Sequence, residues 1–394
     1  MRQLPWLWII AGVIIALVGT NWYIGRVNSS HPAVWAMTGG DSAHRNYTAE
    51  PLPQSPKLLW SYPIGADLPE AGFGRDLTLT PPVVWKDGTI YAGYGSKVHA
   101  IAPNGKKKWA WESKTPIVSL ALGRQGTLYA QADGMLYALN PDGTMAWQQE
   151  IDVRLNEAKP LVVGQGGVIF VTGRVYLTAV TSTGDRKWRF QGGNITSAPA
   201  ELPNGKLTVT VGDKLYLLTR DGDTVWNRTA SPVISTMGLS ATADRIYVLG
   251  RERFAFDADG RGGAAGELTR PPSVMLALGQ DYVQDGITRY DAAWQETQWQ
   301  NADLAQTVQS IMVVVDRDGN TAMMAVDRPG GRRREALLAP TSIRMLDAQG
   351  VQKWEMTDVR PLGALAPAGK GRLCVIGYAT GQNGVQLICI GDQS

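Results

Sequence analysis

Few residues of this sequence could carry redox or metal chemistry, because the 394 residues include only two cysteines and three histidines. Cys374 and Cys389 fall on the two strands of a predicted hairpin, 372–392, whose turn centre lies near residue 381 or 382, so they are near-opposite partners. Such a pair can form a disulfide if it is close enough, whereas strained cross-strand geometry favours two buried free thiols. The sequence leaves both states open. Two cysteines supply too few ligands for a multi-cysteine zinc or iron–sulfur site.

The other polar groupings fit turns better than they fit a catalytic or metal site. Residues 316–320, Asp-Arg-Asp-Gly-Asn, begin like a calcium-binding loop, but the Glu required at position 12 is missing. An Asp-Gly turn between two strands explains the segment. The three histidines are scattered, and each is expected to be structural or exposed rather than a ligand: His31, His44 and His99.

One basic loop suggests contact with a partner or a lipid. Arg332, Arg333 and Arg334 follow Pro329 and two glycines, and such a cluster can touch anionic lipid or an acidic protein surface. A solvated loop is the alternative. The net charge of the whole chain, +3, gives no electrostatic footprint for a nucleic-acid partner.

The first 25 residues predict a transmembrane anchor. Residues 4–19 are uncharged and almost wholly apolar, and with residues 20–25 the uncharged stretch reaches about 20 residues, enough for a helix to span about 30 Å of hydrocarbon. Aromatic residues at both ends suit the two lipid–water interfaces. A cleaved signal peptide is the alternative. We expect residues 4–25 to contact the bilayer as a single pass of the cytoplasmic (inner) membrane, with the following domain on the extracytoplasmic, periplasmic side.

The elements that position the polar residues follow a repeat. Three short strands rich in Val, Ile, Thr, Tyr and Leu precede each copy of the motif Gly-x-x-x-Trp, and the tryptophan marks a fourth strand. Four strands in about 40 residues are typical of a propeller blade. The clearest copies of the motif are Gly105–Trp109, Gly143–Trp147, Gly184–Trp188, Gly222–Trp226 and Gly350–Trp354.

Degenerate copies complete a ring. One has Ala264 at the tryptophan position, and another ends at Trp299 with one residue inserted. Residues 58–63 look like a fourth strand with no blade before it, and residues 359–392 supply three strands with no fourth, so together they predict a last blade closed by the N-terminal strand. The tryptophans at the blade position are expected to be structural, because a large flat ring fills the gap between adjacent blades: Trp60, Trp109, Trp147, Trp188, Trp226, Trp299 and Trp354.

The predicted fold class is therefore all-β. We expect an eight-bladed β-propeller of four-stranded antiparallel blades over residues 57–394, preceded by one N-terminal transmembrane helix at 1–25 and a linker or lead-in at 26–56. Trp35 and Tyr47 could pin part of that linker against the domain. Four tryptophans have no position in this scheme: Trp35, Trp85, Trp111 and Trp294.

The strands and turns of residues 127–130, 135–140 and 143–147 resemble the pyrroloquinoline-quinone-like (PQQ-like) repeat of eight-bladed propellers, and the resemblance extends over residues 57–394. Residues 35–42 also look like the lead-in of that superfamily. Two kinds of protein carry this architecture: quinoprotein alcohol and glucose dehydrogenases, and non-catalytic scaffolds such as the propeller of the outer-membrane β-barrel assembly machinery. The repeat therefore implies a fold more strongly than a function.

A quinoprotein dehydrogenase would imply a calcium ion held by carboxylate and amide oxygens, a catalytic Asp and a flat platform for the quinone. No set of positions in this sequence matches these residues, and Cys374 and Cys389 are not neighbours, as the disulfide of the alcohol-dehydrogenase branch requires. We expect a non-catalytic, membrane-anchored, extracytoplasmic scaffold that needs no cofactor and binds other membrane or periplasmic proteins of a complex. It would differ from the assembly-machinery propeller in having a transmembrane helix in place of a lipidated cysteine. A PQQ-dependent dehydrogenase and a ligand-binding ectodomain are the alternatives.

Overall fold

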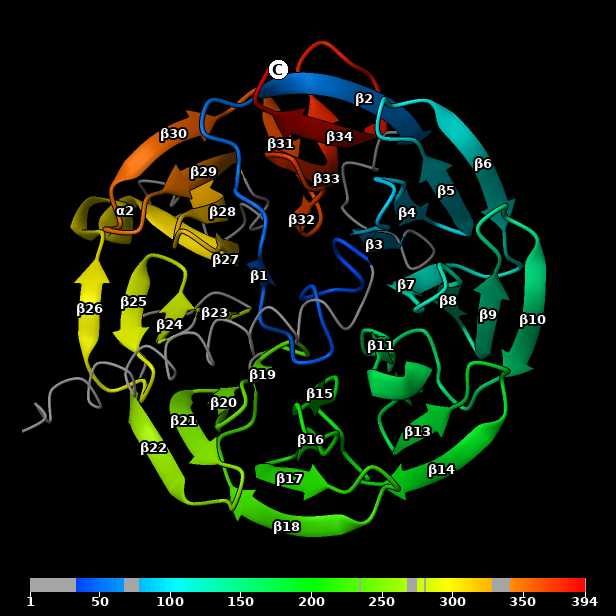
Figure 1. Cartoon of the computed structure of the whole chain (residues 1–394), viewed down its shortest axis with the longest axis vertical. Helices are drawn as coiled ribbons and strands as arrows, with labels where there is room; N and C mark the ends of the chain where they lie inside the picture. Colours follow the sequence, from blue (N-terminus) through cyan, green and yellow to red (C-terminus); the bar gives the residue numbers. More distant parts are fainter. Residues whose placement is uncertain are drawn as a thin grey trace, which may run out of the picture.

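The computed structural model describes residues 33–66, 78–233, 235–267, 275–279, 281–327 and 341–393. They form eight β-sheets arranged as a ring around a central axis (Figure 1). The prediction of an all-β, eight-bladed propeller is confirmed. The predicted transmembrane helix falls on residues outside the described ranges. Among the residues that are described, no helix has both the length and the apolar composition that crossing a membrane requires.

The first six blades each consist of four consecutive strands, with the first strand innermost and the fourth at the rim (Figure 1). A short 3-10 turn, η1 (Gln165–Gly167), joins the first two strands of blade 3. Blades 1 to 3 contain β3 (Leu79–Val84), β4 (Ile90–Tyr94), β5 (Lys97–Ile101) and β6 (Lys107–Glu112); β7 (Ile117–Leu122), β8 (Leu128–Ala132), β9 (Met135–Leu139) and β10 (Met145–Glu150); and β11 (Val162–Val163), β12 (Ile169–Thr172), β13 (Tyr176–Val180) and β14 (Arg186–Gln191). Blades 4 to 6 contain β15 (Ala200–Glu201), β16 (Leu207–Val211), β17 (Lys214–Leu218) and β18 (Thr224–Thr229); β19 (Leu239–Ala241), β20 (Arg245–Leu249), β21 (Glu252–Asp257) and β22 (Gly262–Glu267); and β23 (Ala277–Leu278), β24 (Tyr282–Asp285), β25 (Thr288–Asp291) and β26 (Thr297–Gln300).

The last two blades contain strands from both ends of the chain. In blade 7, β1 (Tyr47–Thr48) pairs in parallel with β27 (Val308–Asp316). In blade 8, β2 (Lys57–Gly65) pairs antiparallel with β34 (Val385–Gly391) and takes the rim position. The predicted closure of the last blade by the N-terminal strand is present. The remaining elements are α2 (Ala302–Thr307), β27 (Val308–Asp316), β28 (Thr321–Asp327), β29 (Ser342–Leu346), β30 (Gln352–Met356), β31 (Val359–Pro361), β32 (Ala366–Pro367), β33 (Arg372–Ala379) and β34 (Val385–Gly391).

Burial explains why the strands of one blade differ in composition. All five residues of β8 are buried, because neighbouring blades cover both faces of a middle strand, and its sequence is accordingly a nearly continuous apolar run. The rim strand β10 of the same blade has five exposed residues and one half-buried residue, Trp147, and its other side chains are mostly polar. The hydrophobic core therefore lies between the blades.

Residues 33–56, which we name the axial segment, lie within the ring, although the sequence suggests a linker there. Residues 33–48 run through the middle of the ring, where the innermost strand of each blade would otherwise present an unpaired edge, and residues 49–56 lead outward to β2 at the rim (Figure 1). Main-chain N–H groups of six blades donate to carbonyls of this segment at 2.7–2.9 Å: Val84 to Trp35, Leu122 to Ala36, Glu201 to Ser42, Ala241 to Ala43, Leu278 to Arg45 and Val315 to Asn46. The described part of the predicted linker is thus a structural part of the propeller.

Candidate functional site

The contact between two adjacent blades follows one pattern, which we call the regular joint. In the joint of blades 1 and 2, the indole of Trp109 lies on the turn glycine Gly143, and its Nε1 donates to the Pro141 carbonyl at 2.8 Å. A Cβ atom on Gly143 would lie 2.7 Å from the indole, and the φ angle of Gly143 is +90°, so both space and backbone favour glycine. Within its own blade, Trp109 contacts Tyr91, with ring centroids 5.6 Å apart.

All seven predicted blade tryptophans make this joint. In six cases the acceptor carbonyl belongs to the residue two positions before the turn glycine of the next blade, and in the seventh it belongs to the axial segment, which precedes the closing strand β2. The Nε1 donors and the carbonyl acceptors, 2.8–3.0 Å apart, are Trp60 with Pro103, Trp109 with Pro141, Trp147 with Ser182, Trp188 with Arg220, Trp226 with Ala258, Trp299 with Ala348 and Trp354 with Pro53.

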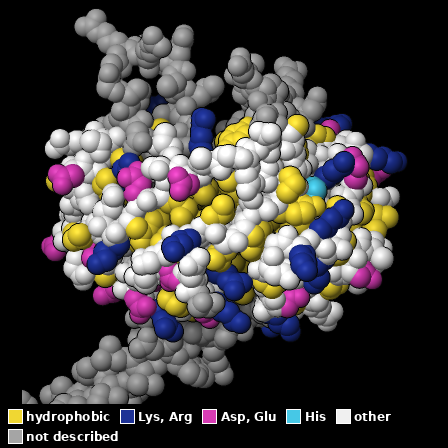
Figure 2. Space-filling view, turned by 90° about the horizontal axis from the view of Figure 1, so that it is seen from above, with side chains coloured by type: hydrophobic (Ala, Val, Ile, Leu, Met, Phe, Trp, Pro, Cys, Tyr) yellow, Lys and Arg dark blue, Asp and Glu magenta, His cyan; other side chains and the backbone are white. Residues whose placement is uncertain are grey.

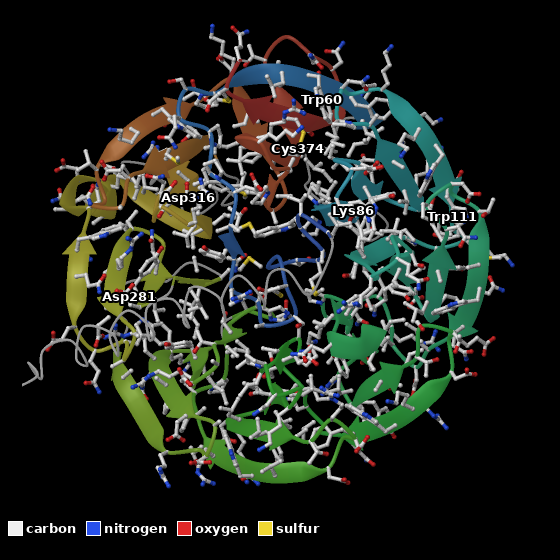
Figure 3. All side chains as sticks on the ribbon, in the orientation of Figure 1. Trp60, Lys86, Trp111, Asp281, Asp316 and Cys374 are labelled. Carbon is white, nitrogen blue, oxygen red and sulfur yellow. A yellow bond between two sulfur atoms is a disulfide. The ribbon has the colours of Figure 1, made fainter. Side chains whose placement is uncertain are left out.

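A second layer of rings reinforces some joints. Two residues after the blade tryptophan, Trp111 of blade 1 packs edge-on against Tyr137 of blade 2, with centroids 4.9 Å apart. In the joint of blades 3 and 4, Phe190 likewise packs against Tyr216, with ring centroids 5.6 Å apart. Trp111, which the sequence left without a role, therefore belongs to the joints and lies near the rim, as does Trp60 (Figure 3).

The joint of blades 5 and 6 is built differently, and we call it the exchanged joint. The rim strand β22 has Ala264 at the tryptophan spacing, and Gly263 is the residue paired with Ala255. The large ring comes instead from blade 6, where Trp294 occupies the place of the turn glycine: its N–H donates to the Asp291 carbonyl, as the N–H of Gly143 does to Asn140. Tryptophan and glycine have thus changed places across this joint.

Trp294 fills the joint at a conformational cost. Its φ angle is +62°, a region that non-glycine residues seldom adopt, and its side chain is completely buried. The indole contacts Tyr247 of blade 5 at 5.8 Å, the counterpart of the contact between Trp109 and Tyr91. The Tyr247 hydroxyl donates to the Ala292 carbonyl at 2.7 Å. Ala292 lies two residues before Trp294, so its carbonyl corresponds to the one that accepts from the blade tryptophan in a regular joint. Burial raises the pKa of Tyr247 to about 12, which keeps this donor protonated.

Arg253 of β21 lies in the exchanged joint and is only partly paired. Its guanidinium is centred 4.4 Å from the Tyr290 ring and 5.7 Å from the Trp294 ring, and the residue is 8% exposed. Neither Nε nor Nη1 has a hydrogen-bond partner among the described residues. Gly266 of β22 is its cross-strand partner, and a Cβ atom on that glycine would lie 2.6 Å from Nη2. The guanidinium therefore lies beside the bare backbone of the rim strand.

The neighbouring joint contains an arginine whose three guanidinium nitrogens all donate hydrogen bonds. Arg289, in the joint of blades 6 and 7, donates to Gln284 Oε1 and to the carbonyls of Gly319 and Ala348. It also lies 3.8 Å above the Tyr282 ring. Because a buried charged group without hydrogen bonds is costly, the contrast marks Arg253 as a group with unused donors.

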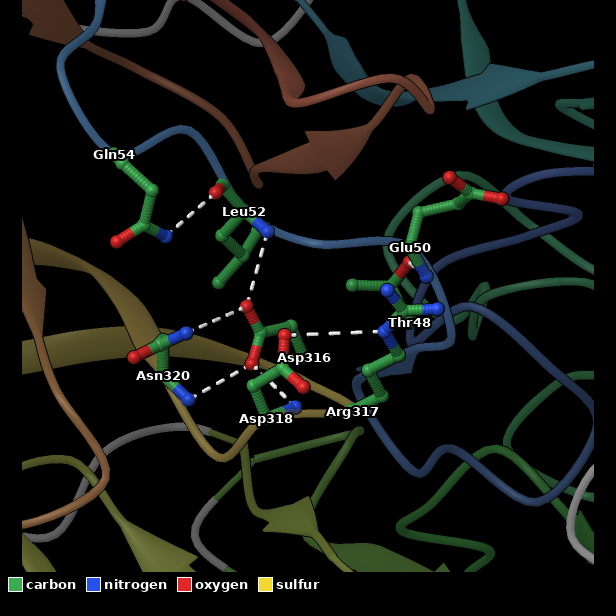
Figure 4. A network of polar contacts seen from close by, with 8 residues as sticks. All are labelled: Thr48, Glu50, Leu52, Gln54, Asp316, Arg317, Asp318 and Asn320. Carbon is green, nitrogen blue, oxygen red and sulfur yellow. Dashed lines mark hydrogen bonds and ion pairs between the residues drawn. The ribbon is translucent and has the colours of Figure 1, made fainter.

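The turn at 316–320 is a structural junction (Figure 4). One carboxylate oxygen of the buried Asp316 accepts from the N–H groups of Asp318 and Asn320, and the other accepts from the N–H of Leu52 and from Asn320 Nδ2, all at 2.8–3.0 Å. These four donors fix the turn and tie it to the axial segment. Within the described ranges, no group of three or more His, Cys, Asp or Glu side chains is arranged to hold a metal ion.

The described histidines are packed into the frame. His44 of the axial segment is fully buried, its Nδ1 donates to the Leu239 carbonyl, and burial lowers its pKa to about 4. His99 packs edge-on against Tyr62, and its pKa is also lowered to about 4, mainly by burial and then by Lys107 and Lys97. His31 lies outside the described residues. Both described imidazoles are neutral at pH 7.

The axial segment also buries a carboxylate. Glu201 accepts from Ser42 Oγ at 3.0 Å and from the Gln165 N–H at 2.8 Å. Burial raises its pKa, and these two hydrogen bonds oppose that rise. One donor belongs to the axial segment and the other to blade 3, so this carboxylate helps to hold the segment in the ring.

The remaining predicted residues fall into two groups. Cys374 and Cys389 lie directly opposite each other on β33 and β34, with Cα atoms 4.1 Å apart, and are joined in a disulfide. This cross-link lies in blade 8, where Cys389 also pairs with Trp60 of the closing strand. The basic cluster Arg332, Arg333 and Arg334 lies outside the described residues.

Sequence reasoning missed the exchanged joint and Arg253. The spacing contained the signal for Trp294, which follows Asp291 by three residues, as each turn glycine follows the residue that accepts its hydrogen bond. The remaining unassigned tryptophans also have structural places: Trp85 packs on the turn at Gly126, and Trp35 is buried against Gly40 of the axial segment.

Comparisons with known proteins agree on the fold. A family model described as outer membrane protein assembly factor BamB matches residues 94–231. No curated protein matches the chain. The solved structure of BamB from Moraxella catarrhalis has a TM-score of 0.60 at 17% sequence identity, covering 85% of this chain and 97% of that chain.

Two further solved structures have a similar fold. Sqt1 from Saccharomyces cerevisiae has a TM-score of 0.58 at 11% identity, covering 84% of this chain and 98% of that chain. A catalytically inactive virginiamycin B lyase from Staphylococcus aureus, solved with quinupristin, has a TM-score of 0.50 at 11% identity, covering 86% and 100%. At these identities the likeness to solved structures establishes the fold alone. The family-model match shows that residues 94–231 resemble the PQQ-like repeats of BamB, and the solved structures show that the described ring has the same type of fold.

Proposed function

We propose that this protein is a non-catalytic scaffold that holds partner proteins together in a membrane-associated complex. The observation that carries the proposal is the use of its reactive side chains: Asp316, Glu201 and His44 bond to the ring or the axial segment, and Cys374 and Cys389 bond to each other. Groups engaged in this way hold a frame together, and a rigid frame with many surface loops is suited to docking. The likeness to BamB, an outer-membrane assembly factor, supports the same reading.

The proposal includes a place in the cell. Residues 4–25 would anchor the chain in the inner membrane as a single helix, with the propeller on the periplasmic side. The apolar composition of that stretch supports the anchor, and the disulfide supports an oxidising compartment. A protease-protection assay on intact membranes tests this part: the propeller should be cleaved only when protease reaches the extracytoplasmic side, and a domain accessible from the cytosol would contradict it.

Partner capture tests the scaffold itself. The full-length chain is crosslinked in native membranes, extracted gently and sized, and we expect a complex that contains other membrane or periplasmic proteins in fixed ratio. A variant lacking residues 1–25 serves as the control, because it should keep the propeller and lose the membrane association. Recovery of the full-length chain as a monomer without partners would contradict the proposal.

A second assay separates the scaffold from a quinoprotein dehydrogenase, since the ring fold alone occurs both in an assembly factor and in a lyase. Purified full-length protein is mixed with PQQ and calcium and followed by absorbance and by dye reduction with alcohols and glucose. We expect no spectral change and no reduction. Saturable quinone binding together with dye reduction would overturn the proposal in favour of the enzyme.

A further inference from the structure

The rim strand of blade 5 differs from every other rim strand of the ring. The first five residues of β22 are Gly262, Gly263, Ala264, Ala265 and Gly266. Each of the other rim strands carries a blade tryptophan, and all of them except β26 also carry at least one Lys, Arg or Glu. In β22 the tryptophan is missing and the one charged residue, Glu267, comes at the last position. On the side of β2, Lys and Arg side chains stand out from the surface (Figure 2).

This difference matters because a rim strand is the open edge of its sheet. Among the described strands, β22 pairs only with β21, and its position at the rim is visible in Figure 1. Natural proteins protect such edges with charged side chains, prolines or covering segments, because an unprotected edge can pair with another strand. Residues 262–266 of β22 have no large side chain to obstruct such pairing, and Ala264 is exposed.

A second, independent feature at this edge indicates the charge of what would bind. Arg253 is more than nine-tenths buried, its Nε and Nη1 lack hydrogen-bond partners among the described residues, and its Nη2 lies beside Gly266. Arg253 and Gly266 are cross-strand partners, so Arg253 and the bare position share one face of the sheet. A strand added to β22 would lie about 4.8 Å further out, and its residue opposite Gly266 would face the guanidinium.

We propose that β22 is a docking edge for an extended peptide of a partner protein, which adds a strand to blade 5 and places an acidic side chain against Arg253. This inference rests on the scaffold function proposed above and names a surface for it. Main-chain hydrogen bonds would provide the affinity, and the carboxylate would provide the register and specificity, because a guanidinium offers a fork of N–H donors to a carboxylate.

A defined peptide tests the proposal with full-length protein in detergent. The probe is a fluorescein-labelled peptide of about eight residues, a typical strand length, with alternating threonine and valine and one central glutamate. A matched peptide has glutamine in place of the glutamate, and a third is methylated on alternate backbone nitrogens. By fluorescence anisotropy, the glutamine peptide should bind roughly tenfold more weakly or worse, because the charge-assisted bond is lost, and the methylated peptide should not bind.

Matched variants of the protein locate the site. Arg253→Gln should make the glutamate and glutamine peptides bind equally. Ala264→Glu should abolish binding of both by placing a charge on the exposed edge. Asn227→Glu in β18 is its control, because Asn227 is also exposed and is paired with Tyr216 as Ala264 is with Phe254. The control should bind the glutamate peptide as the wild type does, and the melting curve of each variant verifies its folding.

Several outcomes would overturn the proposal. They are equal binding of the two peptides to the wild type, binding that Ala264→Glu leaves unchanged in a folded protein, and no binding at millimolar peptide. Self-association that Ala264→Glu abolishes would also overturn it, since a second copy would then be the occupant. If native crosslinked complexes persist in the Ala264→Glu variant, the scaffold function stands and only this edge is excluded, whereas the absence of any complex in the wild type is the failure of the scaffold function itself.

Discussion

The regular joint between blades 1 and 2 and the exchanged joint between blades 5 and 6 solve one packing problem in opposite directions. In the first, Trp109 reaches forward from the rim strand onto a glycine of the next blade. In the second, Trp294 reaches back from the turn, and the rim strand has the small residues. The gap between blades therefore requires one large ring and one position without a side chain, but either blade can supply the ring.

The two arrangements differ in what they leave exposed and in what they cost. The regular joint leaves a rim strand with a tryptophan and polar neighbours, whereas the exchanged joint leaves residues 262–266 of β22 without a large side chain. The exchanged joint also holds a tryptophan at a φ angle of +62°, and its Nε1 lacks a hydrogen-bond partner among the described residues. Such a cost is retained more readily where it serves a purpose, which agrees with a docking role for β22.

Opening the ring is the perturbation with the largest expected effect. Deleting residues 57–65 removes β2, the Trp60 joint and the rim strand of blade 8 together. We expect the protein to lose its cooperative thermal transition or to melt far below the wild type, because closure joins the first and last blades. Circular dichroism and calorimetry measure this, and unchanged melting would show that the ring does not depend on closure.

Removing one regular ring should cost less. Trp109→Ala is expected to lower the free energy of unfolding by about 3 kcal/mol or more, since it empties an interblade space and leaves the Pro141 carbonyl without its donor. Ala264→Gly, at the corresponding spacing of the exchanged joint, should cost less than about 1 kcal/mol. Urea denaturation gives both values. Similar losses in the two variants would mean that the joints are not built differently.

Lowering the pH should weaken the contact between blade 5 and the axial segment. The axial segment makes hydrogen bonds to that blade through His44 and Ala43, and the pKa of His44 is about 4 in the folded state against about 6.5 unfolded. As the pH falls, the unfolded chain therefore binds a proton at this histidine before the folded chain does. The contribution of neutral His44 to the free energy of unfolding is complete above about pH 6.5 and declines by about 3 kcal/mol toward pH 4. Burial raises the pKa of Glu201, which acts in the opposite direction.

The difference between two proteins isolates the histidine. Urea midpoints of the wild type and His44→Gln are measured between pH 7 and pH 4.5, and the loss of stability on acidification should be smaller in the variant. Hydrogen exchange should show β19 losing protection before β7 does, because the Leu239 carbonyl accepts from the imidazole. Parallel pH profiles of the two proteins would contradict the assignment of this titration to His44.

The repeat made the ring predictable, because the spacing from turn glycine to tryptophan records a contact made at every regular joint. The axial segment was less predictable: its hydrogen bonds run from carbonyls such as those of Trp35 and Asn46 to strands far away in the chain, and main-chain bonding leaves little trace in composition. The sequence did not indicate a role for Arg253, because that role depends on the absence of a side chain at Gly266, its partner on the neighbouring strand.

The double-mutant cycle of Ala264→Trp and Trp294→Gly tests the exchange most directly. Together the two changes restore the regular spacing of tryptophan and glycine, and the strand can then adopt the register of the other blades. We predict that Trp294→Gly alone strongly destabilises the protein, that Ala264→Trp alone does not stabilise it, and that the pair is more stable than the sum of the two changes by about 1–3 kcal/mol in urea denaturation. Strictly additive losses would show that Trp294 does not stand in for the missing blade tryptophan.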